Sequence, residues 1–223
     1  MGKRILITIF YILLVSFVFG QTEVKSDSKL NYDLISILDT IHANDQKYRE
    51  KIDEIAEKYG LQSNEMKDIW KTMLEMDSIN LRKVKNIIDE NGWLGSDIIG
   101  EQGNKTLFLV IQHSDFKTQA AYLPVLREAV KIHNAKASHL ALLEDRVALS
   151  QGKKQIYGSQ VGQDNKTGEY YIFPIEDPEN IDKRRAEVGL EPISEYLKTW
   201  NLNWDAKKHK AVIEEKEKNK NTP

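Results

Sequence analysis

Apolar residues recur with the period of an α-helix along most of this chain of 223 residues. The clearest example is the stretch 30–59, where they return roughly every 3.6 residues until Gly60 interrupts the pattern. A second helix is predicted after Ser63, whose hydroxyl can cap it, and a third, short helix over 80–88. These segments predict two or three antiparallel helices.

The middle of the chain continues the helical pattern. The run Thr106–Ile111 is apolar enough for a buried strand or a buried helix, and its helical neighbours favour helix. Asp115 is the expected N-cap of the next helix, which Pro124 should interrupt. A further helix from Ser138 to Gly152 is apolar on nearly all sides, which predicts that it is buried.

Two segments have the character of β-strands. Polar and apolar residues alternate over much of 155–161, and 169–175 is rich in aromatic residues. Turn-forming residues fill 162–168 between them, so the pair predicts a hairpin. Gly158 inside the first strand predicts a bulge or a close approach of the backbone. The predicted fold class is therefore mainly α (α-rich α+β), a helical bundle-like domain with one β-hairpin near residues 154–175.

Residues 1–20 are predicted to be a secretory signal peptide that is cleaved after Gly20. Lys3 and Arg4 precede a run of about fifteen apolar residues, which is shorter than the ~20 that a membrane-spanning helix needs. We therefore expect a secreted or periplasmic protein with no stable membrane span after cleavage. The alternative is an uncleaved N-terminal anchor.

The rest of the chain divides by pattern and composition. We expect an N-terminal helical region at 21–76, a core domain at 77–205 and a charged, disordered tail at 206–223. The chain has no cysteine, which excludes disulfides and thiolate chemistry. Its formal net charge of −2 at pH 7 argues against a nucleic-acid partner.

Gln112 and His113 directly follow the apolar run, so the imidazole of His113 should be largely buried. We expect His113 to be a general base or a ligand, with Asp115 or Asp145 orienting its ring and Gln112 beside it. The alternative is a core histidine that donates to a backbone carbonyl, while Asp115 only caps a helix.

Charged residues also lie inside two apolar helices. Asp145 and Arg146 have apolar neighbours three and four positions away, and buried charges are uncommon unless they are paired or functional. With Glu144 they form a charged triplet, which provides either a structural ion pair that ties this helix to a neighbour or a carboxylate and a guanidinium at the floor of a pocket. In the first helix, Asp45 and Arg49 either pair across one turn, or Gln46 and Arg49 face the pocket.

A further set of amide, phenol, acid and base side chains surrounds the predicted hairpin. Aromatic and amide groups beside arginine suit a sugar or an anionic group, which makes these residues candidates for ligand binding. The structural alternatives are that Asp177 caps a helix and that Arg184 and Arg185 lie on a solvated helix face. The candidates are Gln155, Tyr157, Gln160, Asp177, Arg184 and Arg185.

Several short motifs follow one another along the chain. They are Gln112-His113-Ser114-Asp115, Tyr122-Leu123-Pro124, Leu142-Leu143-Glu144-Asp145-Arg146-Val147, Gln155-Ile156-Tyr157-Gly158-Ser159-Gln160, Pro174-Ile175-Glu176-Asp177-Pro178 and Arg184-Arg185. This ordered set resembles a bacterial family known only as a domain of unknown function, over about residues 77–200. Leu94 and Ser159 stand where that family is expected to carry Pro and Thr. The resemblance implies one compact domain and supplies no activity.

Three functions are compatible with these residues. The one we favour is a secreted hydrolase-like enzyme whose polar pocket consists of His113, Asp145, Arg146 and the segment 155–160, with Arg146 stabilising negative charge. The second is a domain that binds a small polar molecule, a glycan or a peptide without chemistry. The third is a buried polar network that only fixes the fold. The chain has no GxSxG or HExxH motif and no convincing histidine spacing, so we expect no metal and no cofactor.

Overall fold

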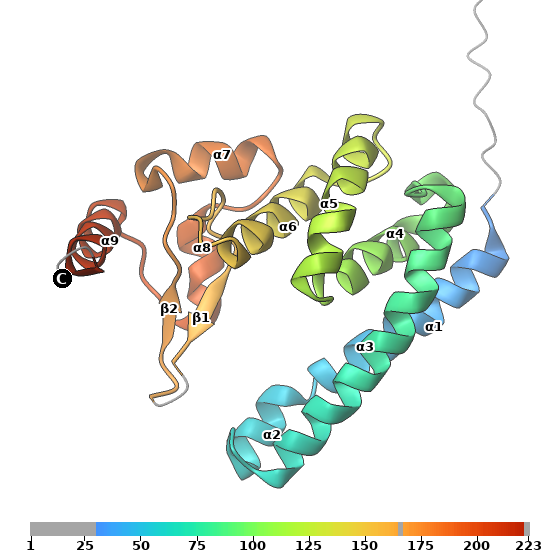
Figure 1. The fold of residues 1–223 in the computed structure, drawn as a ribbon, viewed down its shortest axis with the longest axis horizontal. Helices are drawn as coiled ribbons and strands as arrows, with labels where there is room; N and C mark the ends of the chain where they lie inside the picture. The colour runs from blue at the N-terminus through green and yellow to red at the C-terminus, as the bar shows by residue number, and fades with distance from the viewer. Residues whose placement is uncertain (1–29, 165–166, 221–223) are drawn as a thin grey trace, which may run out of the picture.

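Helices dominate the structure, as the sequence pattern predicts, and the part of the chain that the structure describes contains one antiparallel hairpin (Figure 1). The computed structural model describes residues 30–164 and 167–220. The predicted signal peptide lies outside these residues. Within them, no helix is long and apolar enough to cross a membrane.

The molecule has a helical part and a smaller part around the hairpin. The helices before the hairpin are α1 (Tyr32–Arg49), α2 (Ile52–Tyr59), α3 (Asn64–Asn91), α4 (Ser96–Gln112), α5 (Phe116–Lys131) and α6 (Ala137–Ser150). The later elements are β1 (Val161–Gln163), β2 (Tyr170–Ile172), η1 (Pro178–Asn180), α7 (Ile181–Glu187), α8 (Ile193–Leu197), η2 (Lys198–Trp200) and α9 (Ala206–Lys220). In Figure 1, α1 and α3 lie side by side with α2 at one end of the molecule, and the hairpin with α7, α8 and α9 forms the other end.

Several helix ends are the predicted ones. The side chain of Ser63 accepts a hydrogen bond from the backbone N–H of Met66 at 3.1 Å and starts α3. Asp115 starts α5 in the same way through the N–H of Thr118 at 2.7 Å. Each cap satisfies a backbone donor that has no partner inside the helix, which explains why the helices begin at these residues.

The main hydrophobic core lies between α1, α3, α4, α5 and α6. Each of these helices contributes a fully buried side chain. They are Leu38, Val84, Leu107, Leu126 and Leu143, in chain order. Burial of one such side chain stabilises the fold by roughly 1.5–3 kcal/mol, so α1 is held firmly against the later helices.

A second, small core lies beneath the hairpin. It consists of Ile175, Ile181, Ile193 and Leu197, and the partly buried Val161 and Ile172 of the two strands pack on it. The strands are in antiparallel register, with Val161 opposite Ile172 and Gln163 opposite Tyr170. Because a lone two-stranded hairpin is marginal in water, this second core is what holds β1 and β2 in place.

The first predicted strand is wrong in its position. β1 begins only at Val161, and Gln155 makes one isolated bridge, to Ile175. The intervening residues 156–160 form no strand, because side chains from α6 and α7 take up hydrogen bonds of their backbone.

Four helix predictions also need correction. The stretch 30–59 is two helices, and 80–88 is part of the long α3. Pro124 does not end α5, because the residues around it are anchored in the main core. The tail from 206, which we expected to be disordered, forms α9 through Lys220 and buries Ile213.

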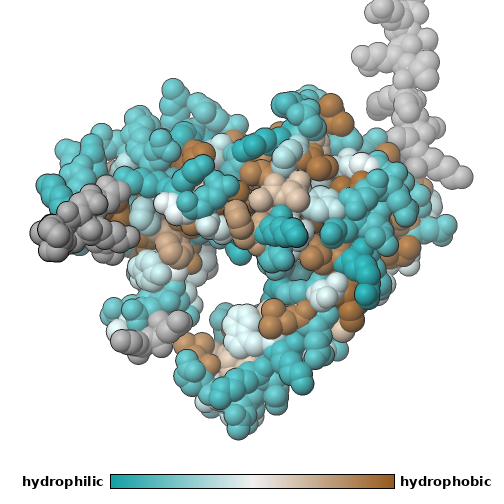
Figure 2. Space-filling view, in the orientation of Figure 1, coloured by the Kyte–Doolittle hydropathy of each residue, from teal (hydrophilic) through white to brown (hydrophobic). Residues whose placement is uncertain are grey.

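The space-filling view shows an open notch between the hairpin and the α2 end of the helical part (Figure 2). Large apolar side chains on α3 are open to solvent near the α2 end of that helix. Trp70 and Leu74, one turn apart, are 47% and 69% exposed. Asp77 follows on the same face of α3, so an apolar strip leads along this helix to a polar residue.

Gly158 is predicted to tolerate no side chain. Its φ is +64°, and a Cβ atom there would lie within 3.0 Å of Ile175, Ile181 and Ile193. We expect Gly158→Ala to lower the free energy of unfolding by roughly 2–5 kcal/mol, from left-handed backbone strain and overpacking together. Gly189→Ala is the matched control, because φ is +74° there but a Cβ would meet nothing within 4 Å. Urea denaturation measures both, and equal losses would contradict the packing argument.

Candidate functional site

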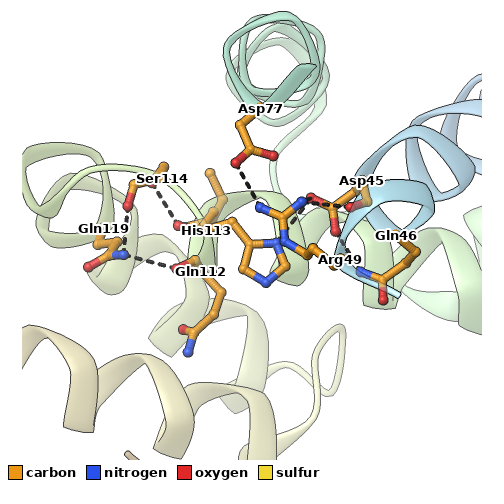
Figure 3. Close-up of polar contacts among 9 residues, drawn as sticks. Asp45, Gln46, Arg49, Asp77, Gln112, His113, Ser114 and Gln119 are labelled. Carbon is orange, nitrogen blue, oxygen red and sulfur yellow. Dashed lines mark hydrogen bonds and ion pairs between the residues drawn. The ribbon is translucent and has the colours of Figure 1, made fainter. Parts of the chain in front are cut away.

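The most distinctive polar contact in the structure joins α1 to the end of α4 (Figure 3). His113, the C-cap of α4, places its Nδ1 atom 3.0 Å from Oδ1 of Asp45. The Asp45 side chain is 1% exposed and that of His113 is 21% exposed. A buried carboxylate therefore holds an imidazole that reaches the surface.

This contact fixes which nitrogen of His113 carries the hydrogen in the neutral ring. A carboxylate only accepts, so the hydrogen lies on Nδ1 and the lone pair lies on Nε2. Nε2 points away from Asp45, as Figure 3 shows, and no side chain or backbone group in the described ranges hydrogen-bonds to it. The site thus offers a proton acceptor on a partly exposed ring.

Three further side chains hold Asp45 in place. Arg49 donates through Nη1 to the backbone oxygen of Asp45 at 2.6 Å and lies 3.2 Å from its Oδ1 atom. Nη2 of Arg49 contacts Oδ2 of Asp77 on α3 at 2.7 Å. Gln46 donates to Oδ2 of Asp45 at 2.6 Å. We call these four residues, together with His113, the acid–base cluster.

The pKa of Asp45 results from opposing effects. Burial raises the pKa of this carboxyl, but the hydrogen bond and charge of His113, the charge of Arg49 and the amide of Gln46 together outweigh it. The pKa of Asp45 is therefore lowered, and the group is ionised at neutral pH. It places a fixed negative charge beside the imidazole.

The backbone under His113 is also held by a side chain. Nε2 of Gln119 donates to the backbone oxygens of Gln112 and Ser114, at 2.9 and 2.8 Å. The two carbonyls flank His113 at the end of α4, where helix carbonyls otherwise lack partners. Gln119 is itself buried, so the position of the imidazole is fixed from both sides.

Buried polar atoms without a protein partner lie next to the acid–base cluster. Among the described residues these include Oδ1 of Asp77, both side-chain polar atoms of Asn80 one turn further along α3, and Oε1 of Gln112. Such atoms are uncommon in folded proteins, because each costs free energy unless it is hydrogen-bonded. They mark unused hydrogen-bonding capacity beside His113.

The partner of His113 differs from the two that we expected. Asp115 is exposed and only caps α5, which was our structural alternative for it. Asp145 lies on α6 and binds backbone N–H groups. The predicted pair of Asp45 and Arg49 is present, but Asp45 is also the residue that orients the ring.

Asp145 organises the segment 155–160. It is fully buried, and its carboxylate accepts hydrogen bonds from the backbone N–H groups of Ile156, Tyr157 and Ser159 at 2.6, 3.0 and 2.9 Å. Hydrogen bonds to an ionised acceptor are stronger than neutral ones, so this group ties the segment to α6. Asp145 therefore has a structural role.

The amides expected to bind ligand are also used internally. Nε2 of Gln155 donates to the backbone oxygens of Gln160 and Phe173 at 3.1 and 3.0 Å, and its Oε1 accepts from the N–H of Gln160. Gln160 donates to Ser159. Burial raises the pKa of the Tyr157 hydroxyl, and this half-buried phenol keeps its proton. The two amides thus form hydrogen bonds with each other and with the nearby backbone, and none of these bonds involves His113.

Of the charged candidates, two hold the same segment from α7. Arg184 donates to the backbone oxygens of Ile156 and Glu176 at 2.9 and 2.6 Å and contacts Asp177. Asp177 occupies the N-cap position before Pro178, in line with its structural alternative, but its side chain makes no capping hydrogen bond, and its φ is +43°. Arg185 donates to the backbone oxygen of Tyr157 at 2.8 Å.

Arg146 is the exception among the predicted site residues. It is half-buried on α6, and no residue in the described part of the chain gives it a hydrogen bond or an ion pair. Its Nε atom is buried without a partner, and burial lowers the pKa of its guanidinium. The structural ion pair that ties this helix to a neighbour is formed, among the described residues, by the adjacent Glu144, which contacts Arg127 of α5 at 2.9 Å, and not by Asp145 or Arg146.

A metal centre is not evident in residues 30–164 and 167–220, where no three His, Asp or Glu side chains converge as ligands. His139 stacks on Phe108 with ring centroids 4.2 Å apart. Burial lowers the pKa of His139 to about 4, so this ring is neutral at physiological pH.

Fold and site together define a mainly helical domain that carries a surface imidazole on a buried carboxylate. The chain belongs to a family of unknown function (DUF6624), which it matches over residues 32–209. The match extends beyond the 77–200 that the motifs indicated and includes α1, with Asp45. No curated protein and no solved structure matches the chain.

Sequence reasoning missed the roles of Asp45 and Asp77. A signal for Asp45 was present, because it continues the buried face of α1 that carries Leu38 and Ile41. An acid at a core position of an amphipathic helix indicates a buried partner. No local pattern identified that partner, since His113 is 68 residues away in the sequence.

The lowered pKa of Asp45 predicts a pH-dependent stability. A carboxyl whose pKa is lower in the folded state contributes fully above the unfolded value, near 3.9, and loses that contribution as the pH falls through the folded value. We expect Asp45→Asn to lower the free energy of unfolding at neutral pH and to cost less below about pH 4. Urea denaturation across this range measures it, with the exposed Asp68→Asn as control. A loss that is constant with pH would contradict the prediction.

Asp145→Asn is predicted to destabilise the fold strongly. The variant replaces one acceptor oxygen by an NH2 group that faces backbone N–H groups, so at least one buried donor loses its partner. We expect a loss of about 3 kcal/mol in the free energy of unfolding. The neighbouring Glu144→Gln, which removes a surface pair with Arg127, should cost less than about 1 kcal/mol. Comparable losses in a urea titration would show that Asp145 does not hold the segment.

Proposed function

We propose that this protein is a hydrolase-like enzyme in which Asp45 and His113 form the general acid–base centre. One observation carries the proposal: a buried, ionised carboxylate binds Nδ1 of an imidazole whose Nε2 is unpartnered on a partly exposed ring. This is the arrangement that general base catalysis by histidine requires.

Water is the proposed nucleophile. Nε2 of His113 takes a proton from a water molecule as its oxygen attacks an electrophilic centre, and then gives that proton to the leaving group. The charge of Asp45 stabilises the imidazolium that forms between the two steps. The adjacent hydroxyl, that of Ser114, donates to the backbone oxygen of Ile111 at 2.7 Å, which favours water over serine as nucleophile.

Arg49 and Asp77 are positioning residues in this proposal. The guanidinium of Arg49 already faces two carboxylates, so its charge is not free for a substrate. It fixes Asp45 between α1 and α3 and stabilises its ionised form. The side-chain oxygen of Gln112, the residue next to His113, is unpartnered, and we assign to this amide the role of orienting a polar substrate.

The proposed place of action is outside the cytoplasm, secreted or periplasmic. It rests on the basic residues, apolar run and small residues at the start of the sequence, which have the pattern of a cleaved signal peptide. The substrate would then be a small polar molecule, a glycan or a peptide that occurs there.

The proposal predicts a hydrolytic activity that depends on His113. The purified protein would be incubated with pooled esters, amides, phosphoesters and glycosides, and products identified by mass spectrometry. We expect His113→Gln to lower kcat/KM at least about 100-fold, and Asp45→Asn to lower it and to change its pH profile. His133→Asn is the matched control, because His133 is exposed with a φ of +61° that asparagine tolerates. No hydrolysis of any pool, or an activity that His113→Gln leaves intact, would refute the proposal.

A further inference from the structure

A separate cavity lies between α6 and the turn that joins α7 to α8. Its volume is about 290 Å³, at the lower end of the range for small-molecule sites. Leu142, Leu190 and the ring of Tyr196 provide apolar walls, and Ser159, Arg185 and Glu191 provide polar groups. None of these residues belongs to the acid–base cluster.

Arg185 places a buried positive charge at this cavity. The residue is 1% exposed, yet its hydrogen bonds go to neutral carbonyls, those of Glu191 at 2.5 Å and Tyr157 at 2.8 Å. No carboxylate in the described ranges forms an ion pair with it. The carboxylates of Glu191, Asp182 and Asp145 act on it only at longer range. A fully buried guanidinium without a direct ion pair is uncommon, because its loss of hydration is then only partly offset.

One edge of this guanidinium remains available. Nε and Nη1 are used by the two carbonyls, and the guanidinium lies over the ring of Tyr196 at 4.9 Å. Nη2 has no acceptor among residues 30–164 and 167–220 and is not one of the fully enclosed unpartnered atoms. Since Arg185 lines the cavity, we infer that Nη2 is the donor available to a ligand there.

Arg146 adds a second cation near the same place. It lies one turn beyond Leu142 on α6, and its charge acts on Tyr196 together with that of Arg185. It has no ion pair, and its Nε atom is buried and unpartnered. Arg185 thus lines the cavity, and Arg146, which also has no ion pair, lies nearby on α6 without lining it. Glu191, the acid that lines the cavity, is exposed, but its charge acts on Arg185 and opposes the binding of an anion there.

We propose that this cavity binds a small carboxylate with an apolar body, with Arg185 facing its carboxylate group and Arg146, on α6 beside the cavity, adding positive charge. Guanidinium groups suit a carboxylate, and the leucine and tyrosine walls suit the apolar body better than a fully hydrated anion such as phosphate. The site is independent of the proposed chemistry at His113.

Isothermal titration calorimetry of the full chain with benzoate tests the proposal. Benzamide is the uncharged analogue, and inorganic phosphate is an anion without an apolar body. We expect saturable binding of benzoate, with a Kd on the order of 1 mM for so small a ligand, and at least about 10-fold weaker binding of the other two. Absence of benzoate binding, or equal binding of benzamide or phosphate, would overturn the proposal.

Variants assign the binding to the cavity. Arg146→Gln should weaken benzoate binding at least about 10-fold, Arg146→Lys should weaken it less, and Leu142→Trp should abolish it by filling the space. Glu191→Gln should tighten it severalfold. Arg82→Gln, which removes an exposed arginine of α3, and His113→Gln should bind as the natural protein does. Thermal unfolding checks that each variant is folded, and unchanged binding in both Arg146→Gln and Leu142→Trp would refute the assignment.

Discussion

The buried carboxylate of Asp145 is the interaction on which the smaller part of the molecule depends. It binds the backbone N–H groups of the segment 156–159, and that segment carries Gly158 into the second core. The carbonyls of the same segment accept from Arg184 and Arg185 on α7. The hairpin, α7 and the cavity are therefore placed relative to α6 by one charged side chain and the backbone that surrounds it.

Two buried carboxylates in this structure have different roles, and their partners explain why. Asp145 is satisfied by backbone donors, which cannot take up or release a proton in the physiological range. Asp45 is satisfied by side chains, and one of them is an imidazole with a second nitrogen that reaches the surface. A carboxylate bound only by backbone amides fixes geometry, whereas one bound to histidine can also support proton transfer.

Local pattern predicted most of the helical fold and only part of the candidate site. Helical periodicity and the caps at Ser63 and Asp115 located the helices, because these signals act within a few residues. The alternation of polar and apolar residues over 155–161 wrongly predicted a strand there, because the backbone of this segment hydrogen-bonds to side chains instead of to a second strand. His113 was identified, but its partner Asp45 was not, since the two meet only after α1 packs on α4. Long-range pairing of this kind has no local sequence signal.

The two polar centres are linked through packed helices. α4 carries His113 at its end, and α6 carries Asp145 and Arg146. The two helices are joined by the parallel stack of Phe108 on His139, which stays neutral at physiological pH because its pKa is near 4. An uncharged, buried contact is little affected by salt or by moderate changes of pH. The spacing between the acid–base cluster and the arginine-lined cavity is therefore set by packed helices, and a shift of one centre relative to the other would have to break this stack.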